Sequence, residues 1–152
     1  MNETVLLTGI SGWIAKHTAI ELLKSGYKVL GTVRDSSLIE QTKKTINEYA
    51  SIDKLSFVEL DLLKDEGWDE ALKGCKYVMH VASPFPLKTS RDRESLVPTA
   101  KDGTIRVLKA AVNAGVERII KTSSIATMFR KPNRKNPYTC LLYTSDAADD
   151  RC

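Results

Sequence analysis

Cysteine is scarce in this sequence, and no arrangement of the thiols predicts a cross-link or a metal site. Cys75 stands alone, whereas Cys140 and Cys152 lie close to the C-terminus, and no C-x-x-C pair occurs. This usage predicts a reducing, cytoplasmic location without disulfides. Histidine is equally rare. Because neither His17 nor His80 has a metal-type neighbour in the sequence, both are predicted to be structural and no metal site is expected.

Long hydrophobic runs and clustered charges are missing as well. No stretch approaches the roughly 20 apolar residues of a membrane span, and the N-terminal letters MNETVLLTG enter a strand without the layout of a signal peptide. The net charge is only +4 and the basic residues are scattered, which argues against a nucleic-acid groove. With 152 residues, 42% of them hydrophobic, we expect one soluble domain with neither a membrane nor a nucleic-acid partner.

The sequence does contain a regular alternation of short apolar strands and helical patterns. Strands are predicted at residues 4–8, 28–33, 55–60, 76–82 and 117–124, and helices at residues 13–24, 38–49, 68–72 and 96–114. The last helix is expected to bury a stripe that includes Gly103, Val107 and Val112. The alternation predicts right-handed crossovers and a three-layer α/β/α fold, in which helices cover both faces of a doubly wound parallel sheet.

The turn between the first strand and the first helix, TGISGWIA, has the chemistry of a phosphate-binding loop. A side chain at Gly9 would strain the tight bend, one at Gly12 would keep the backbone from a pyrophosphate, and the small Ala15 lets helix and strand pack closely. The helix N-terminus adds N–H groups and the positive end of its dipole. The turn predicts dinucleotide binding, with an ordinary strand–helix turn as the alternative. Trp13 either packs in the core or lines this loop.

The second strand ends in TVRD, at the position that distinguishes NAD from NADP in folds of this kind. An acidic residue there binds the 2′-hydroxyl of NAD, whereas an arginine accommodates the 2′-phosphate of NADP. Arg34 comes first and could contact the phosphate through two N–H groups, with Lys43 or Lys44 as helpers. Asp35 follows directly and keeps NAD open, and a solvated charge pair is the third reading. The order of the two residues favours NADP.

Polar and small residues also follow the third, fourth and fifth strands, where ligands of open α/β sheets lie. Asp61 could accept a hydrogen bond from an adenine amino group with Leu62 against the ring, or it could cap the next helix. The segments HVASPF and TSSIAT end the fourth and fifth strands and leave room for a nicotinamide and a substrate carbonyl. A serine there either donates to a developing oxyanion or caps a strand end.

Taken in order, these segments resemble one large family of enzymes. TGISGWIA, TVRD, ELDL, HVASPF, VPTAKDGTIRVLKAA and VERIIKTSSIATM are similar to the motifs of extended short-chain dehydrogenases/reductases of the NAD-dependent epimerase/dehydratase type, over residues 4 to about 128. TVRD and ASPF resemble most the branch of dihydroflavonol reductases and NADPH-dependent aldehyde or methylglyoxal reductases. The resemblance implies a Rossmann-like domain and NADP-dependent reduction of a small aldehyde or ketone to an alcohol. A non-catalytic dinucleotide-sensing module and a sugar-nucleotide epimerase or dehydratase are the alternatives.

The resemblance also implies a role for individual residues. It places Gly9, Gly12, Trp13 and Ile14 at the pyrophosphate, Arg34 at the 2′-phosphate, Asp61 and Leu62 at the adenine, Val81, Ala82 and Ser83 at the nicotinamide-side ribose, Thr122 and Ser123 near the nicotinamide, and Ser124 as the catalytic serine that orients the carbonyl. In the family a tyrosine protonates the carbonyl oxygen, and a lysine four residues later lowers the pKa of that tyrosine.

The tyrosine and lysine are where this sequence departs from the family. None of its 5 tyrosines is followed by a lysine four places on, so we expect the polypeptide to be inactive. Cys140–Asp149 can be back-translated into an adapter used to build DNA sequencing libraries. We therefore expect residues 1–139 to be an incomplete NAD(P)-binding domain, cut after about its fifth strand, and residues 140–152 to be a tail encoded by that adapter. A natural disordered C-terminus is the alternative.

Overall fold

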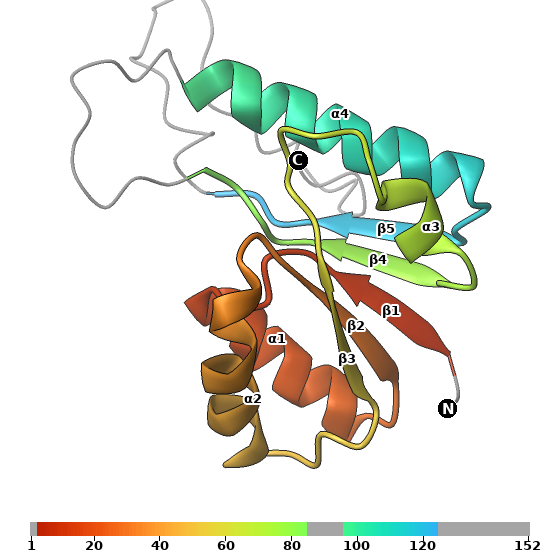
Figure 1. Cartoon of the computed structure of the whole chain (residues 1–152). Coiled ribbons are helices and arrows are strands. Elements are labelled where there is room, and N and C mark those ends of the chain that lie inside the picture. Colours follow the sequence, from red (N-terminus) through yellow and green to blue (C-terminus); the bar gives the residue numbers. More distant parts are fainter. Residues whose placement is uncertain (1–2, 85–95, 125–152) are drawn as a thin grey trace, which may run out of the picture. The chain divides into compact units, whose positions relative to one another are not determined.

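The computed structural model of the chain describes residues 3–84 and 96–124. Strands and helices alternate along these residues (Figure 1). In chain order the elements are β1 (Thr4–Leu7), α1 (Trp13–Lys24), β2 (Lys28–Val33), the short 3-10 helix η1 (Ser36–Leu38), α2 (Ile39–Asn47), β3 (Leu55–Glu59), α3 (Trp68–Leu72), β4 (Tyr77–His80), α4 (Leu96–Asn113) and β5 (Arg118–Lys121).

The strands form one parallel sheet in the order β3-β2-β1-β4-β5. From β1 the chain builds outward through β2 to β3, and then returns to the other side of β1 to add β4 and β5. The direction of winding therefore reverses between β1 and β4, which makes this point the topological switch of a doubly wound sheet. The predicted Rossmann-like α/β fold is confirmed.

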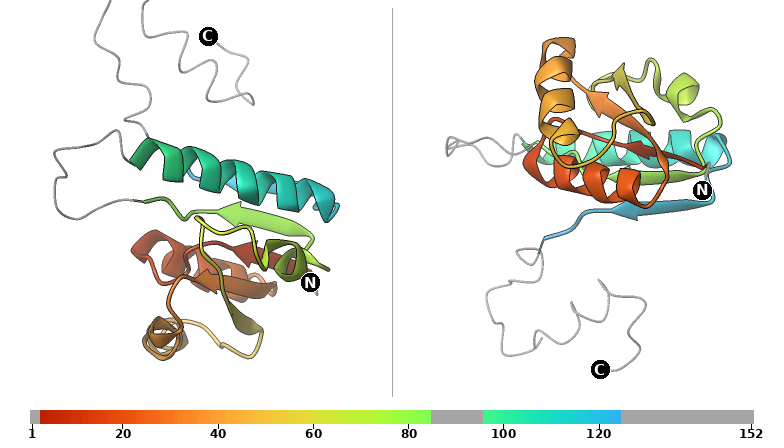
Figure 2. Two further views of the ribbon diagram at one scale, coloured as in Figure 1. Left: turned by 45° about the horizontal axis from the view of Figure 1, so that its top comes forward. Right: turned by 90° about the horizontal axis from the view of Figure 1, so that it is seen from below.

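Two separate hydrophobic clusters cover the two faces of this sheet. Side chains of successive strand residues point to opposite faces, so that Leu6 joins the cluster beneath α3 and α4 while Leu7 joins the one beneath α1 and α2. Trp68 is the largest side chain of the first cluster, and Ile46 of α2 is fully buried in the second. Figures 1 and 2 show the two pairs of helices on opposite faces of the strands.

The ends of the elements differ from the prediction by a few residues. The predicted strands at 76–82 and 117–124 are shorter, because pairing stops at His80 and Lys121. The predicted helix at 38–49 is preceded by η1, which the Asp35 side chain caps by accepting a hydrogen bond from the Ser37 N–H at 2.9 Å. Val112 was expected on the buried stripe of α4, but it is 71% exposed.

The chain divides into two units, one ending at Lys121 and the other beginning at Thr122. Of the second unit, the structure describes only residues 122–124, which are exposed and outside regular secondary structure. The predicted tail at 140–152 and its boundary after residue 139 lie outside the described residues. Within the described ranges, no helix combines the length and apolar character needed to cross a bilayer.

Candidate dinucleotide-binding site

A cavity of about 830 Å³ opens at the carboxyl ends of β1, β2, β3 and β4. It lies at the topological switch between β1 and β4, the place where open α/β sheets bind ligands. Its lining, among the described residues, comprises Gly9, Ser11, Gly12, Trp13, Ile14, Ala15, Thr32, Arg34, Asp35, Leu38, Leu60, Asp61, Leu62, Leu63, Trp68, Val81, Ala82, Ser83, Pro84 and Thr99.

The glycine turn after β1 brings bare backbone to the middle of this cavity. Gly9 has a φ of +68°, and a Cβ built on it would lie 2.9 Å from the Cβ of Ala82. The turn is anchored from β2, because Thr32 Oγ1 accepts the Gly9 N–H at 3.1 Å and the Thr32 carbonyl accepts the Ile10 N–H at 3.0 Å. Only glycine therefore fits at position 9 without displacing the segment after β4.

The N-terminus of α1 points its first N–H groups at the same cavity. Gly12 is the N-cap of α1, and no side chain of the described residues caps this end of the helix. Unpaired N–H groups and the positive end of the helix dipole form an anion-binding position. A dinucleotide pyrophosphate would fit the turn, because no Cβ stands between it and the backbone at either glycine.

Trp13 and Ile14 extend from this helix end toward solvent. Trp13 is 77% exposed and Ile14 is 52% exposed, and both line the cavity. The Trp13 ring lies edge-on to the His17 ring, with 4.8 Å between their centroids. Of the two alternatives for Trp13, packing in the core is thus wrong, and the side chain borders the phosphate-binding turn.

The segment after β2 contributes Arg34 and Asp35 to the cavity wall, and the two side chains have different environments. The Asp35 carboxylate caps η1, and its hydrogen bond from Ser37 holds the pKa of this carboxyl below its usual range, with a smaller contribution from the charge of Arg34. One oxygen of Asp35 is therefore already engaged by the protein. Arg34 is exposed at the rim of the cavity.

The two lysines suggested as helpers of Arg34 are not among the residues that line the cavity. Both lie on α2. Lys43 Nζ is 2.9 Å from Glu40 Oε1 and 5.9 Å from the centre of the Phe57 ring, so this side chain is directed along its own helix and over β3. Lys44 occupies the last turn of α2.

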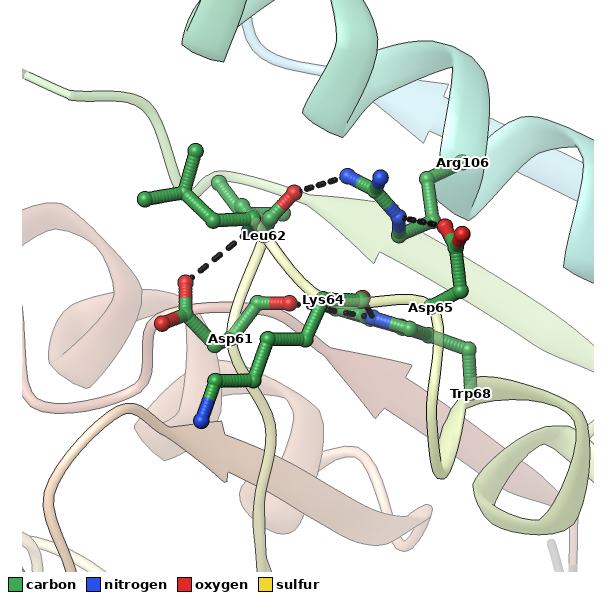
Figure 3. A network of polar contacts seen from close by, with 7 residues as sticks. Asp61, Leu62, Lys64, Asp65, Trp68 and Arg106 are labelled. Atoms are coloured by element: carbon green, nitrogen blue, oxygen red, sulfur yellow. Dashed lines mark hydrogen bonds and ion pairs between the residues drawn. The ribbon is translucent and has the colours of Figure 1, made fainter.

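Residues 60–63 of the loop after β3 line the next part of the cavity, and Figure 3 shows the polar contacts of this loop. Asp61 Oδ1 accepts the Leu63 N–H at 2.9 Å, and the Asp61 carbonyl accepts the Lys64 N–H at 3.1 Å. The helix-capping alternative for Asp61 is wrong, because α3 begins at Trp68 with Gly67 as its N-cap. Asp61 instead caps a turn of its own loop, and both Asp61 and Leu62 line the cavity.

The segment after β4, from Val81 to Ser83, also lines the cavity, and a buried network holds it. Thr8 Oγ1 accepts two backbone N–H groups, those of Val81 at 3.0 Å and Ala82 at 2.9 Å. With its acceptor sites used in this way, the Thr8 hydroxyl donates its own proton to His80 Nδ1 at 2.9 Å. The Thr8 side chain thus fixes the main chain that borders the cavity.

The same network defines which nitrogen of His80 carries the proton. The Thr104 hydroxyl of α4 donates to the Ala100 carbonyl at 2.7 Å, so its oxygen accepts from His80 Nε2, 3.4 Å away. His80 is therefore neutral with its proton on Nε2. Burial, and secondarily the charge of Lys121, lowers the pKa of His80 to about 4. This lowered pKa agrees with a neutral ring whose Nδ1 accepts a hydrogen bond. The prediction of a structural role for His80 agrees with this environment.

The remaining predicted residues follow β5. Thr122, Ser123 and Ser124 are exposed and belong to the second unit of the chain. Their proximity to the nicotinamide stays a prediction. Within the first unit, the cavity brings together all predicted cofactor residues except the two lysines of α2.

Sequence reasoning did not identify the residues that support the site from behind. Thr32 anchors the glycine turn, and Thr8 anchors the segment after β4. Thr99 of α4 lines the cavity, and Arg106 of α4 contacts the loop after β3. A threonine at each of two strand ends was a local signal for the first pair. No local signal marks Arg106, because its contacts lie 41 and 44 residues away in the sequence.

The switch-point cavity, the glycine turn and the uncapped helix N-terminus belong to an α/β domain with a Rossmann-like fold. The sequence pattern of the NAD dependent epimerase/dehydratase family matches residues 5–146. The chain belongs to this family, as its motifs predicted.

Several of the proteins that this chain resembles are named as reductases. The chain is 32% identical to dihydroflavonol 4-reductase of Zea mays, over 89% of this chain and 38% of that protein. It is 36% identical to aldehyde reductase 2 of Sporidiobolus salmonicolor, over 88% of this chain and 39% of that protein. Among solved structures, it resembles yeast methylglyoxal/isovaleraldehyde reductase Gre2 complexed with NADPH, with a TM-score of 0.71, 30% identity, and 83% and 38% of the two chains covered. The chain thus spans little more than a third of these relatives' length.

Proposed function

We propose that this chain is the cofactor-binding part of an NADPH-dependent reductase that converts a small aldehyde or ketone to an alcohol. The cavity carries this proposal, because it presents bare backbone at Gly9, an uncapped helix N-terminus at Gly12 and an arginine at the end of β2. NADPH would supply the hydride. The residues of the chain would bind the two phosphates, hold the adenosine and orient the carbonyl.

The contrast between Arg34 and Asp35 supports NADP over NAD. A carboxylate that binds the 2′- and 3′-hydroxyls of NAD must present free oxygens to the ribose. One oxygen of Asp35 caps η1, while the guanidinium of Arg34 stands at the rim, where it can pair with a 2′-phosphate through two N–H groups. The structure of Gre2 with NADPH is consistent with this choice.

The carbonyl substrate is inferred from the relatives and from the strand ends. Three of the similar proteins are named as reductases of dihydroflavonols, of aldehydes and of methylglyoxal or isovaleraldehyde. In the proposed enzyme, Ser124 would donate a hydrogen bond to the carbonyl oxygen and so stabilise the charge that develops there during hydride transfer. A separate proton donor would complete the alcohol.

Arg34→Ala tests the cofactor proposal by binding rather than by turnover, since no tyrosine in the sequence has a lysine four residues on. We expect NADPH to bind the 152-residue chain more tightly than NADH does. Arg34→Ala should weaken NADPH by about tenfold or more while leaving NADH nearly unchanged, because a charge-assisted bidentate contact is worth roughly 1.5–3 kcal/mol. Isothermal titration with both nucleotides gives the four dissociation constants.

Lys28→Ala is the matched control, because this exposed lysine lies at the opposite end of the same strand. It should leave both affinities unchanged. Equal affinities of the unmodified chain for NADH and NADPH, or a preference for NADH, would contradict the NADP proposal and favour an NAD-dependent epimerase or dehydratase.

A further inference from the structure

The loop of residues 60–67 connects β3 to α3 without being part of a helix or strand, and its residues 60–63 line the cavity. Most of the polar contacts that shape it are local. Asp61 caps the turn that follows it, and the indole N–H of Trp68 is shared between the carbonyls of Asp61 at 3.2 Å and Lys64 at 3.0 Å. These bonds give the loop its shape, but they do not fix it to the neighbouring helix α4.

Arg106 of α4 supplies that attachment (Figure 3). Its Nη1 donates to the Leu62 carbonyl and its Nε pairs with Asp65 Oδ1, so that one planar guanidinium bridges two points of the loop. The Arg106 side chain is only 19% exposed, whereas that of Asp65 is 86% exposed. Since an exposed ion pair contributes little, the bond to the Leu62 carbonyl is the more important of the two.

Gly103 lies one helical turn before Arg106, on the same face of α4. A Cβ built on Gly103 would lie 3.0 Å from the Cβ of Leu62 and 3.3 Å from its carbonyl oxygen. The loop backbone therefore rests directly on α4 at this point. Gly103 allows the close approach and Arg106 bonds the same carbonyl, so the position of Leu62 is determined by α4 from two sides.

We propose that Arg106 is a positioning residue that fixes the loop of residues 60–67 for the adenine half of a dinucleotide. The inference rests on the proposed function and on the predicted contacts of Asp61 and Leu62 with the adenine. Arg106 acts through the Leu62 carbonyl and is not expected to touch the ligand. A lysine at this position keeps the charge, but its single ammonium group cannot bridge both acceptors as the planar guanidinium of arginine does.

Arg106→Lys tests the proposal, with adenosine 2′,5′-bisphosphate as the probe because it carries the adenine and 2′-phosphate without the nicotinamide. We expect the variant of the 152-residue chain to bind this probe about tenfold more weakly, the scale on which a remote residue couples to a site. Arg118→Lys is the control, since it makes the same replacement at an exposed arginine of β5 and should not change the affinity.

Hydrogen exchange distinguishes positioning from general destabilisation. In Arg106→Lys the amides of Leu63 and Lys64 should exchange faster, because the turn that Asp61 caps is no longer held against α4. The amides of Gly9 and Ile10, which bond to Thr32 on β2, should keep their wild-type rates. Equal acceleration at both places would show a global effect and overturn the proposal.

The possible results separate this inference from the proposed function. Failure of the unmodified chain to bind either the bisphosphate or NADPH overturns the proposed function and this inference with it. Binding by the unmodified chain, with Arg106→Lys within twofold of it, overturns only the role of Arg106. If Arg106→Lys shows no cooperative unfolding, Gly103→Ala replaces it under the same criteria, because the added methyl group displaces Leu62 without changing any charge.

Discussion

The two walls of the cavity are held in different ways. The loop after β3 is tied to α4 by a charged side chain, Arg106, whose carboxylate partner Asp65 is largely in solvent. The segment after β4 is tied to β1 by the neutral network of Thr8, His80 and Thr104, in which Thr8 and His80 are at most 2% exposed. Both networks end on main-chain groups that border the cavity, the Leu62 carbonyl in one case and the Val81 N–H in the other.

The difference follows from the cost of burying charge. In the ion pair of Arg106 and Asp65 the carboxylate stays largely in solvent, so the pair is tolerated but contributes little and is screened by salt. A charged group in the interior beneath β4 would lose its hydration, so the interior uses hydroxyl groups and a neutral imidazole, each with its partners satisfied. The buried network should therefore be sensitive to mutation and pH, and the ion pair of Arg106 and Asp65 to ionic strength.

Among the substitutions, Thr8→Val should have the largest effect on stability, because it removes the acceptor of two N–H groups and the donor to His80 while keeping the shape of the side chain. The amides of Val81 and Ala82 would be left without their partner in the part-buried interior. We expect a loss of about 3 kcal/mol in the free energy of unfolding, measured by urea titration.

Thr8→Ser is the matched variant, since it retains the hydroxyl group and removes only a methyl group. It should keep most of the stability and the slow exchange of the Val81 and Ala82 amides. If the serine and valine variants were equally destabilised, the hydrogen bonds of Thr8 would not be the cause, and packing of the methyl group would explain both.

Lowering the pH should also weaken the buried network. His80 has its pKa lowered from the usual 6.5 to about 4 by burial and by the charge of Lys121. The unfolded chain therefore binds a proton at a higher pH than the folded chain does. Stability from this group is fully present above about pH 6.5 and falls as the pH is lowered from 6.5 to 4, by up to about 1.4 kcal/mol for each pH unit. Urea titrations across this range give the slope.

His80→Asn supplies the comparison, since an amide does not titrate in this range. Its stability should depend less steeply on pH between 6.5 and 4 than that of the unmodified chain, whatever its stability at neutral pH. Among the described residues, the hydroxyls of Thr8 and Thr104 contact the ring, and the charge of Lys121 acts on it at longer range. Parallel curves for the two proteins would exclude His80 as the titrating group.

The fold could be predicted because its signals are local. Short apolar segments alternate with helical ones, and glycines at positions 26, 74 and 115 have positive φ where the predicted helices stop. The errors lie where tertiary contacts decide. Strand pairing, which depends on neighbours in the sheet, ends β4 and β5 earlier than the apolar run suggests, and Val112 lies on the solvent side of α4 despite its hydrophobic side chain.

Only the residues that line the cavity could be predicted from the sequence, and not those that support them. The glycine turn, Arg34 and Asp61 stand at recognisable distances after strands, so their place at the cavity follows from the topology. The environment of each carboxylate did not follow, because Asp35 caps η1 and Asp61 caps a turn of its own loop. The supporting contacts, from Thr8 to His80 across 72 residues and from Arg106 to Leu62 across 44, have no pattern in a single sequence.

Asp65→Asn should have the smallest effect and completes the comparison between the two walls. It removes the charge of the partner of Arg106 but leaves an oxygen that can accept from Nε, and Asp65 is 86% exposed. We expect a loss of no more than about 0.5 kcal/mol in the free energy of unfolding at low ionic strength, and none at about 1 M salt, where the screening length is near 3 Å. Glu66→Gln, the same change of charge at the next exposed position, separates the pair from the general charge balance. A loss as large as that of Thr8→Val, or one that persists in high salt, would mean that the charged contact of Arg106 anchors its loop as strongly as the buried network anchors the segment after β4.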